Sequence, residues 1–123
     1  MAAHILIVDD NSELIDILRD GLERVGHSCE CTGDGGTALR MLEQGAFDLV
    51  ISDIVMPAPD GIELSRLFRK ERPELPFIVI SGSTNASYLD VARRLGARQV
   101  LAKPFTMDEL LQAVDVALQA PQG

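Results

Sequence analysis

The chain has 123 residues, 46% of them hydrophobic, which is enough apolar material for one buried core and argues against disorder. Its 11 Lys and Arg residues against 19 Asp and Glu residues give a net charge of −8, which disfavours direct nucleic-acid binding through a basic surface. No apolar run approaches the roughly 18 residues of a membrane span, and the N-terminus lacks the pattern of a secretory signal. We therefore expect a single cytoplasmic domain over 1–123, with its core at 4–119 and no membrane contact.

The first half of the chain alternates strand patterns with helix patterns. Residues 4–8 form a continuous apolar run, which predicts a strand covered on both faces. A helix closed by Gly26 follows, with one predicted inward stripe at Leu14, Ile17, Leu18, Leu22 and Val25. Residues 28–32 alternate and are more polar, which predicts an edge strand. A turn is predicted for the glycine-rich residues 33–36, and a second helix then continues to Gly45.

The second half repeats this alternation. Strands are predicted at 48–52 and 77–80, with a weaker one at 99–102, and helical spacing recurs at 64–68 and 88–95. The last helix begins at a capping box formed by Thr106 and Glu109. Its predicted inward stripe is Leu110, Val114, Ala117 and Leu118. The pattern predicts an α/β fold of the (βα)₅ type: a doubly wound, five-stranded parallel sheet with helices on both faces. We expect its strands to lie in the flavodoxin-like order 2-1-3-4-5.

The only two cysteines, Cys29 and Cys31, lie one residue apart. That spacing is poor for an intramolecular disulfide, and no second Cys or His pair completes a zinc site. We expect two small residues, buried or half-buried, in a reducing cytoplasm.

Polar residues with chemical potential follow four of the predicted strands. In an open α/β sheet, ligands bind beyond the carboxyl ends of the strands. There this chain has Asp9 with Asp10, then Asp53, Ser81 and Lys103. Three carboxylates held close together need a compensating cation, and an all-oxygen ligand set suits Mg²⁺. A carboxylate nucleophile beside a metal and a lysine indicates phosphoryl transfer to aspartate.

Each of these residues alone carries little weight. An Asp or Asn after a strand, such as Asp10 or Asn11, is most often a turn residue or helix cap. A single lysine such as Lys103 is usually a solvated surface charge, and Ser81 alone indicates a loop. It is their joint occurrence at four strand ends that favours a functional site.

These residues resemble the receiver domain of two-component response regulators, of the size of single-domain chemotaxis regulators. Residues 53–61 match the family pattern D-x-x-M-P-x-x-D-G at every fixed position. The acidic pair after the first strand, the hydroxyl of Ser81 and the dipeptide Lys103-Pro104 complete the match, which covers residues 4–119.

The resemblance implies a phosphorelay role for the site. Asp53 would accept a phosphoryl group from a phosphohistidine on a sensor histidine kinase or histidine phosphotransfer protein. Asp10 and Asp53 would bind Mg²⁺ directly together with the backbone carbonyl of Val55, and Asp9 would act through a metal-bound water. Lys103 and Ser81 would bond the phosphoryl oxygens.

Other matching positions have structural roles in the family. Pro104 would follow a cis peptide bond that fixes the lysine. Loop-shaping roles fall on Met56, Pro57, Asp60 and Gly61. The output surface would be residues 84–119, read by a downstream protein or a fused output domain. The only catalysis expected is of the domain's own phosphorylation and dephosphorylation, so the protein is not expected to be an enzyme.

The sequence departs from the family at one switch position. Val100 stands where the family commonly has an aromatic ring, so we expect the switch to depend mainly on the loop after Ser81 and the helix that follows. Val55 and Ser83 flank the expected phosphoryl site and are weak at positioning water, which predicts slow unassisted dephosphorylation.

Three alternatives remain open from the sequence. A Mg²⁺-dependent phosphatase or phosphotransferase would need a second Asp at position 55, which is Val55, and a cap domain. A nucleotide- or flavin-binding domain would need a phosphate-binding loop after the first strand, where Asp9 and Asp10 stand instead. A degenerate receiver could act as a docking module only. Most receivers of the family are fused to other domains. This slightly favours a receiver taken from a longer regulator, or associated with a kinase, over a stand-alone protein.

Overall fold

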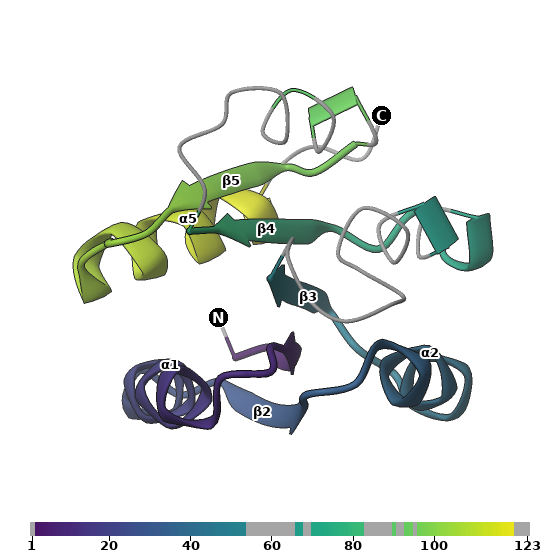
Figure 1. Cartoon of the computed structure of the whole chain (residues 1–123), viewed down its shortest axis with the longest axis horizontal. Helices are drawn as coiled ribbons and strands as arrows, with labels where there is room; N and C mark the ends of the chain where they lie inside the picture. Colours follow the sequence, from purple (N-terminus) through teal and green to yellow (C-terminus); the bar gives the residue numbers. More distant parts are fainter. Residues whose placement is uncertain are drawn as a thin grey trace.

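The computed structural model describes residues 2–53, 66–67, 70–82, 90, 93–94 and 96–119. Five parallel strands form one sheet in the order β2-β1-β3-β4-β5, as predicted (Figure 1). The strands are β1 His4–Val8, β2 Ser28–Thr32, β3 Leu49–Asp53, β4 Phe77–Ser81 and β5 Gln99–Ala102. β2 lies at one edge of the sheet and is its most polar strand, which confirms the edge strand predicted from its alternation.

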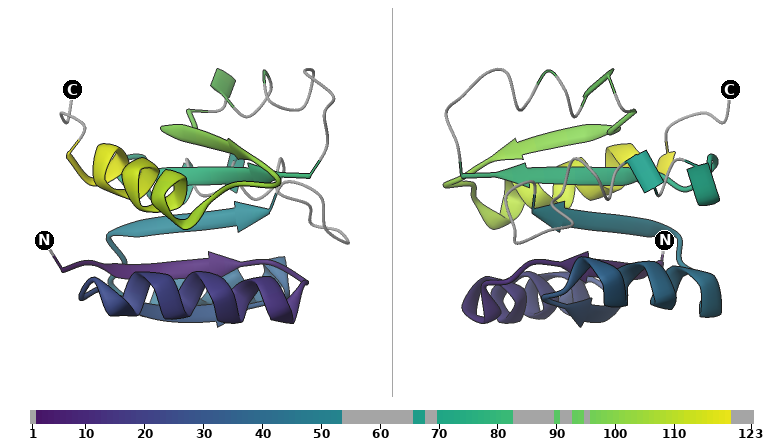
Figure 2. Two further views of the ribbon diagram at one scale, coloured as in Figure 1. Left: turned by 90° about the vertical axis from the view of Figure 1, so that its left-hand side faces the viewer. Right: turned by 45° about the vertical axis from the view of Figure 1, so that its right-hand side comes forward.

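Helices cover both faces of the sheet (Figures 1 and 2). α1 (Ser12–Arg24) and α5 (Met107–Gln119) lie on one face, and α2 (Gly35–Gln44) lies on the other. Successive strand residues supply the two faces alternately, so Ile5 and Ile7 belong to the core under α1 and α5, whereas Leu6 and Val8 belong to the core under α2. The expected helices at 64–68 and 88–95 lie largely outside the described residues.

The capping residues explain where the helices begin. Asn11 caps α1, because its side-chain oxygen accepts from the Glu13 and Leu14 amides at 3.1 and 3.2 Å. The predicted capping box of α5 is confirmed: the Glu109 amide donates to Thr106 Oγ1 at 3.1 Å, and the Thr106 amide donates to Glu109 Oε1 at 3.0 Å.

The turn predicted for residues 33–36 is half wrong. Asp34 caps α2 by accepting from the Thr37 amide at 2.9 Å, so Gly35 and Gly36 already form the first helical turn. The cap outweighs the low helix propensity of the two glycines.

The predicted inward stripe of α1 is wrong at two residues. Ile17 is 58% exposed and Val25 is 54% exposed. The buried side of the helix centres on Leu18, Gly21 and Leu22, and Ile17 lies about 100° away from Leu18 around the helix axis. Val25 lies beyond the last helical residue, and Gly26 follows with a φ of 99°, the left-handed conformation that ends the helix.

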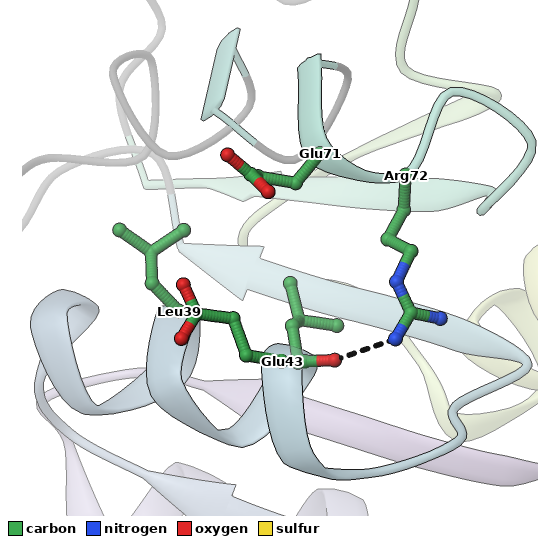
Figure 3. Close-up of a pocket in the computed structure, with 5 residues that line it drawn as sticks. Leu39, Glu43, Glu71 and Arg72 are labelled. Carbon is green, nitrogen blue, oxygen red and sulfur yellow. Dashed lines mark hydrogen bonds between the residues drawn. The ribbon is translucent and has the colours of Figure 1, made fainter.

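The end of α2 is capped from elsewhere in the chain. The last turn of α2 contains no basic residue, yet Arg72 Nη2 donates to the Leu42 carbonyl at 2.9 Å (Figure 3). A guanidinium at a helix C-terminus satisfies an unpaired carbonyl and complements the helix dipole. This contact ties α2 to the segment that leads into β4.

Two further expectations concern the rest of the chain. Cys29 and Cys31 are unpaired and half-buried, and burial raises the pKa of the Cys29 thiol to about 11. Within the described ranges, no helix has the length and apolar character that crossing a membrane requires.

Candidate functional site

The fold brings the predicted polar residues to one edge of the sheet. Asp9 directly follows β1, Asp53 ends β3, Ser81 ends β4 and Lys103 follows β5. Because all the strands are parallel, their carboxyl ends meet at this edge. We refer to Asp9, Asp10, Asp53, Ser81 and Lys103 as the acidic site.

The two oxygens of Asp9 have different surroundings. The residue is 1% exposed, and Oδ1 accepts from the Asn11 amide at 2.8 Å. Oδ2 is buried and has no hydrogen-bond partner within the described part of the chain. A buried carboxylate oxygen without a hydrogen-bond donor is costly, so this atom calls for a cationic ligand.

Lys103 is the cation nearest to these carboxylates among the described residues. Its Nζ donates to Asp53 Oδ2 at 3.3 Å and lies 3.9 Å from Asp9 Oδ2. The Lys103 amide donates to the Ser81 carbonyl at 2.8 Å, and the peptide bond from Lys103 to Pro104 is cis, as expected. The lysine is thus anchored at the backbone while its ammonium reaches Asp53.

The carboxylates are close enough to share one ion. Single oxygens of Asp9, Asp10 and Asp53 all lie within 4.8 Å of one another. Asp9 and Asp53 are buried and Asp10 is exposed, so the cluster faces solvent on one side. Oxygen donors and an open side fit Mg²⁺, which keeps several of its waters. Asp9 Oδ2, which accepts no hydrogen bond from the described residues, supports the same fit.

The electrostatics of the cluster favour cation binding. The pKa of Asp9 lies above its ordinary value of 3.8, chiefly because the carboxyl is buried. The Asn11 amide lowers this pKa, whereas the negative charge of Asp53 raises it. The folded chain therefore holds Asp9 in surroundings that disfavour its own charge.

Two backbone features of the site were missed in the sequence. The Asn11 amide fixes Asp9 Oδ1, and an Asp two residues before a capping Asn is a signal that could have predicted this bond. Gly33 lies against the backbone of the acidic pair, where an added Cβ would be 3.3 Å from the Asp9 carbonyl oxygen and 3.5 Å from Asp10 Cα. That approach joins segments 24 residues apart and has no local signal.

Several predicted positions lie outside the described residues. These are Val55, Met56, Pro57, Asp60, Gly61 and Ser83. Val100 is described: it pairs with Val79 in the ladder and packs, half-buried, against the core under α2. It extends that core and supplies no ring near Ser81.

A hollow of about 230 Å³ lies between α2 and the segment before β4 (Figure 3). Its lining contains Leu39, Leu42, Glu43, Glu71 and Arg72. None of these belongs to the acidic site, so the convergence of charged side chains identifies the candidate site better than this cavity does.

Comparisons with known proteins agree with the residue pattern. The model of the response regulator receiver domain matches residues 5–115. The transcriptional regulator NtrC of Azospirillum brasilense is 37% identical over 119 residues, which are 97% of this chain and 25% of NtrC. The response regulator MprA of Mycobacterium bovis is 34% identical over 97% of this chain and 52% of its own length.

Solved structures show the same likeness. The receiver domain of NtrX from Brucella abortus superposes with a TM-score of 0.91 at 34% identity, over 95% of this chain and 99% of that domain. The chain therefore spans about a quarter of NtrC, half of MprA and nearly all of the isolated NtrX domain.

Proposed function

Because the chain belongs to the response regulator receiver family, whose members are phosphoacceptors in two-component signalling, we propose that its phosphoacceptor is Asp53. The observation that carries this proposal is the position of Asp53 at the end of a central strand, with Lys103 Nζ 3.3 Å from its Oδ2 and the carboxylates of Asp9 and Asp10 beside it. The donor would be a phosphohistidine on a sensor histidine kinase or histidine phosphotransfer protein.

The transfer uses the chemistry of this chain's side chains. A carboxylate oxygen of Asp53 forms the new bond to phosphorus as the bond from phosphorus to the histidine nitrogen breaks. The donor histidine carries a proton on its other ring nitrogen and therefore leaves as a neutral imidazole. Lys103 already lies beside Asp53, so its ammonium can neutralise the oxygens of the incoming group without a large movement. The Ser81 hydroxyl, at the end of the neighbouring strand, is the second group proposed to bond those oxygens.

Asp10 and Asp53 are proposed to hold Mg²⁺ directly, with Asp9 acting through a bound water and the Val55 carbonyl as a further ligand. Once bound, the ion neutralises the negative charge of the carboxylates and of the incoming phosphoryl oxygens. This assignment is supported by the spacing of the three carboxylates and by Asp9 Oδ2, which accepts no hydrogen bond from the described residues.

The signal is proposed to leave through residues 84–119. Phosphorylation adds about −1.5 to −2 charge and three acceptor oxygens, so groups that bond them bias their loops toward a second arrangement. Within the described part of this surface, β5 and α5 enclose a hollow of about 210 Å³, which includes Leu101, Gln112 and Val116. Since Val100 brings no ring, we assign the switch mainly to the loop after Ser81 and the helix expected to follow it.

The wider setting is also part of the proposal. We propose that residues 1–123 form one receiver domain, whose only catalysis is of its own phosphorylation and dephosphorylation, with slow unassisted loss of the phosphoryl group. The partners would be a histidine-containing phosphodonor and a downstream protein or fused output domain. Two unpaired cysteines fit a cytoplasmic location.

The test is labelling with acetyl phosphate in the presence of Mg²⁺, followed by borohydride reduction and peptide mapping. We expect one acid-labile phosphoryl group on Asp53, no labelling of Asp53→Asn and normal labelling of Asp16→Asn, a matched change of an exposed aspartate. Labelling on another side chain, or equal labelling of Asp53→Asn, would overturn the proposal and leave a docking module as the better account.

A further inference from the structure

A second cluster of reactive side chains lies at the opposite edge of the sheet. His4 is the first residue of β1 and Ser28 is the first residue of β2. The parallel ladder pairs His4 with Ser28 and Leu6 with Glu30. Since alternate residues of a strand share a face, the side chains of His4, Ser28 and Glu30 lie together on one side of this edge.

The three side chains form a continuous hydrogen-bonded chain. His4 Nδ1 lies 2.7 Å from Ser28 Oγ, and His4 Nε2 lies 2.6 Å from Glu30 Oε2. A carboxylate only accepts hydrogen bonds, so the proton of a neutral His4 belongs on Nε2. Nδ1 then has a lone pair, and the Ser28 hydroxyl donates to it.

Two further contacts hold His4 in place, one at its ring and one at its backbone. It stacks on Phe47 with a centroid distance of 4.8 Å and an interplanar angle of 9°. The His4 amide donates to Asp48 Oδ2 at 2.9 Å, which fixes the backbone at the start of β1. Ser28 and Glu30 are exposed, so a small molecule in solvent can reach the serine.

This arrangement is that of an activated nucleophile. A serine within hydrogen-bond reach of a base, itself oriented by a third group, is the pattern by which a hydroxyl gains reactivity at neutral pH. Either ring nitrogen of a histidine can act as the base when the other carries the proton.

We propose that Ser28, His4 and Glu30 form a second reactive centre, at which Ser28 accepts an acyl group from small activated esters. The centre is independent of phosphoryl transfer, because His4 and Ser28 begin β1 and β2, and Glu30 follows Ser28 in β2, whereas the acidic site lies where the strands end. It is open to solvent and suits esters with good leaving groups, which need little stabilisation of the oxyanion.

The step is balanced by the residues present. Ser28 Oγ bonds to the acyl carbon while its proton passes to His4 Nδ1, and Glu30 stabilises the resulting imidazolium through the Nε2 proton. The bond from the acyl carbon to the alcohol oxygen then breaks, and the alcohol takes the proton from His4 or leaves as its anion. Water hydrolyses the acyl-serine by the same path, which regenerates Ser28 and releases the carboxylic acid.

The probe is p-nitrophenyl acetate applied to the intact chain, with acetylation located by mass spectrometry of tryptic peptides. Fragmentation of peptide 25–40 separates acetyl-Ser28 from acetylated Cys29 or Cys31. We expect Ser28 to react about 10²-fold faster than Ser12, the contribution of a positioned general base. Ser12 is a matched control, since it is exposed and opens α1 without a histidine partner among the described residues.

Two variants separate activation from simple exposure. His4→Gln should reduce the Ser28 rate to that of Ser12, and Glu30→Gln should slow it by about tenfold or more because the base loses its orienting carboxylate. Glu30 is exposed, so its variant remains informative if His4→Gln fails to fold. Equal acetylation rates at Ser28 and Ser12, or an unchanged Ser28 rate in Glu30→Gln, would overturn the proposal. Labelling of Asp53 by acetyl phosphate should stay normal in Ser28→Ala, because the two sites are separate.

Discussion

The two ends of the strands in this sheet differ in how their buried polar groups are hydrogen-bonded. At the edge where the strands begin, buried His27 accepts from the Ala3 amide through Nδ1 at 3.0 Å, and His4 uses both of its ring nitrogens. At the edge where the strands end, Asp9 keeps a buried oxygen with no hydrogen-bond partner in the described chain, and its pKa is raised by burial.

The difference separates stability from function. A fold optimised for stability alone would give Asp9 Oδ2 a hydrogen-bond donor or replace the Asp9 carboxylate, because a buried oxygen without a donor is costly. Retention of that cost where the strands end, beside the hydrogen-bonded His4 and His27 where the strands begin, is typical of a binding site held ready for a charged ligand.

Within the acidic site, the largest expected effect comes from removing its lysine. Lys103→Met leaves Asp53 and Asp9 without their nearest described cation. We expect the free energy of unfolding, measured with urea in the absence of Mg²⁺, to fall by about 2 kcal/mol. The value is below that of fully buried pairs because the Lys103 side chain is 28% exposed. Arg24→Met, which breaks an exposed pair with Asp20, should cost no more than about 0.5 kcal/mol. Equal losses would contradict the contrast between the edges, and added Mg²⁺ should restore much of the loss in Lys103→Met only.

A smaller loss is expected at the opposite edge. His27→Phe keeps a ring of similar shape but removes the acceptor of the buried Ala3 amide, which should cost about 1–2 kcal/mol. Hydrogen exchange of the Ala3 amide should quicken by more than that of the Ser28 amide, whose acceptor is the Ala3 carbonyl. If neither the free energy of unfolding nor the exchange rate of the Ala3 amide changes, the hydrogen bond from Ala3 to His27 does not stabilise the end of the sheet where the strands begin.

A gain of stability is expected from neutralising the buried acid. Without Mg²⁺, the free energy of unfolding of Asp9→Asn should be about 1 kcal/mol higher than that of the wild type. Such a gain is common when a functional charge is removed. Because the folded pKa of Asp9 is raised, the wild type loses stability as pH rises from 3.8 through that folded value. The advantage of Asp9→Asn should therefore be absent at low pH, grow over that interval and then level off. An advantage that is constant with pH would point to packing as its cause.

The smallest effect is expected away from both edges. Ile17→Gln, at an exposed position of α1, should change the free energy of unfolding by less than about 0.5 kcal/mol. Leu18→Gln, one residue on, is the matched buried change and should be severely destabilising. Similar losses in the two variants would place Ile17 in the core after all.

Much of the fold could be predicted because its signals are local. Apolar runs, and for β2 an alternating pattern, located each strand to within a residue, and the capping box of Thr106 and Glu109 located the start of α5. The acidic site could be predicted in outline as well, since parallel strands bring their ends together once the fold class is known. The α1 stripe failed at Ile17, because an apolar residue marks a helix face only when a partner packs there.

By itself, the order of residues determined that five strands alternate with helices and that carboxylates, a hydroxyl and a lysine follow them, because both depend on periods of a few residues. Only the tertiary structure decided that Arg72 caps α2 and that His4 faces Ser28 and Glu30. These contacts join segments 24 or more residues apart, and their geometry depends on strand register and helix packing, which no local pattern specifies.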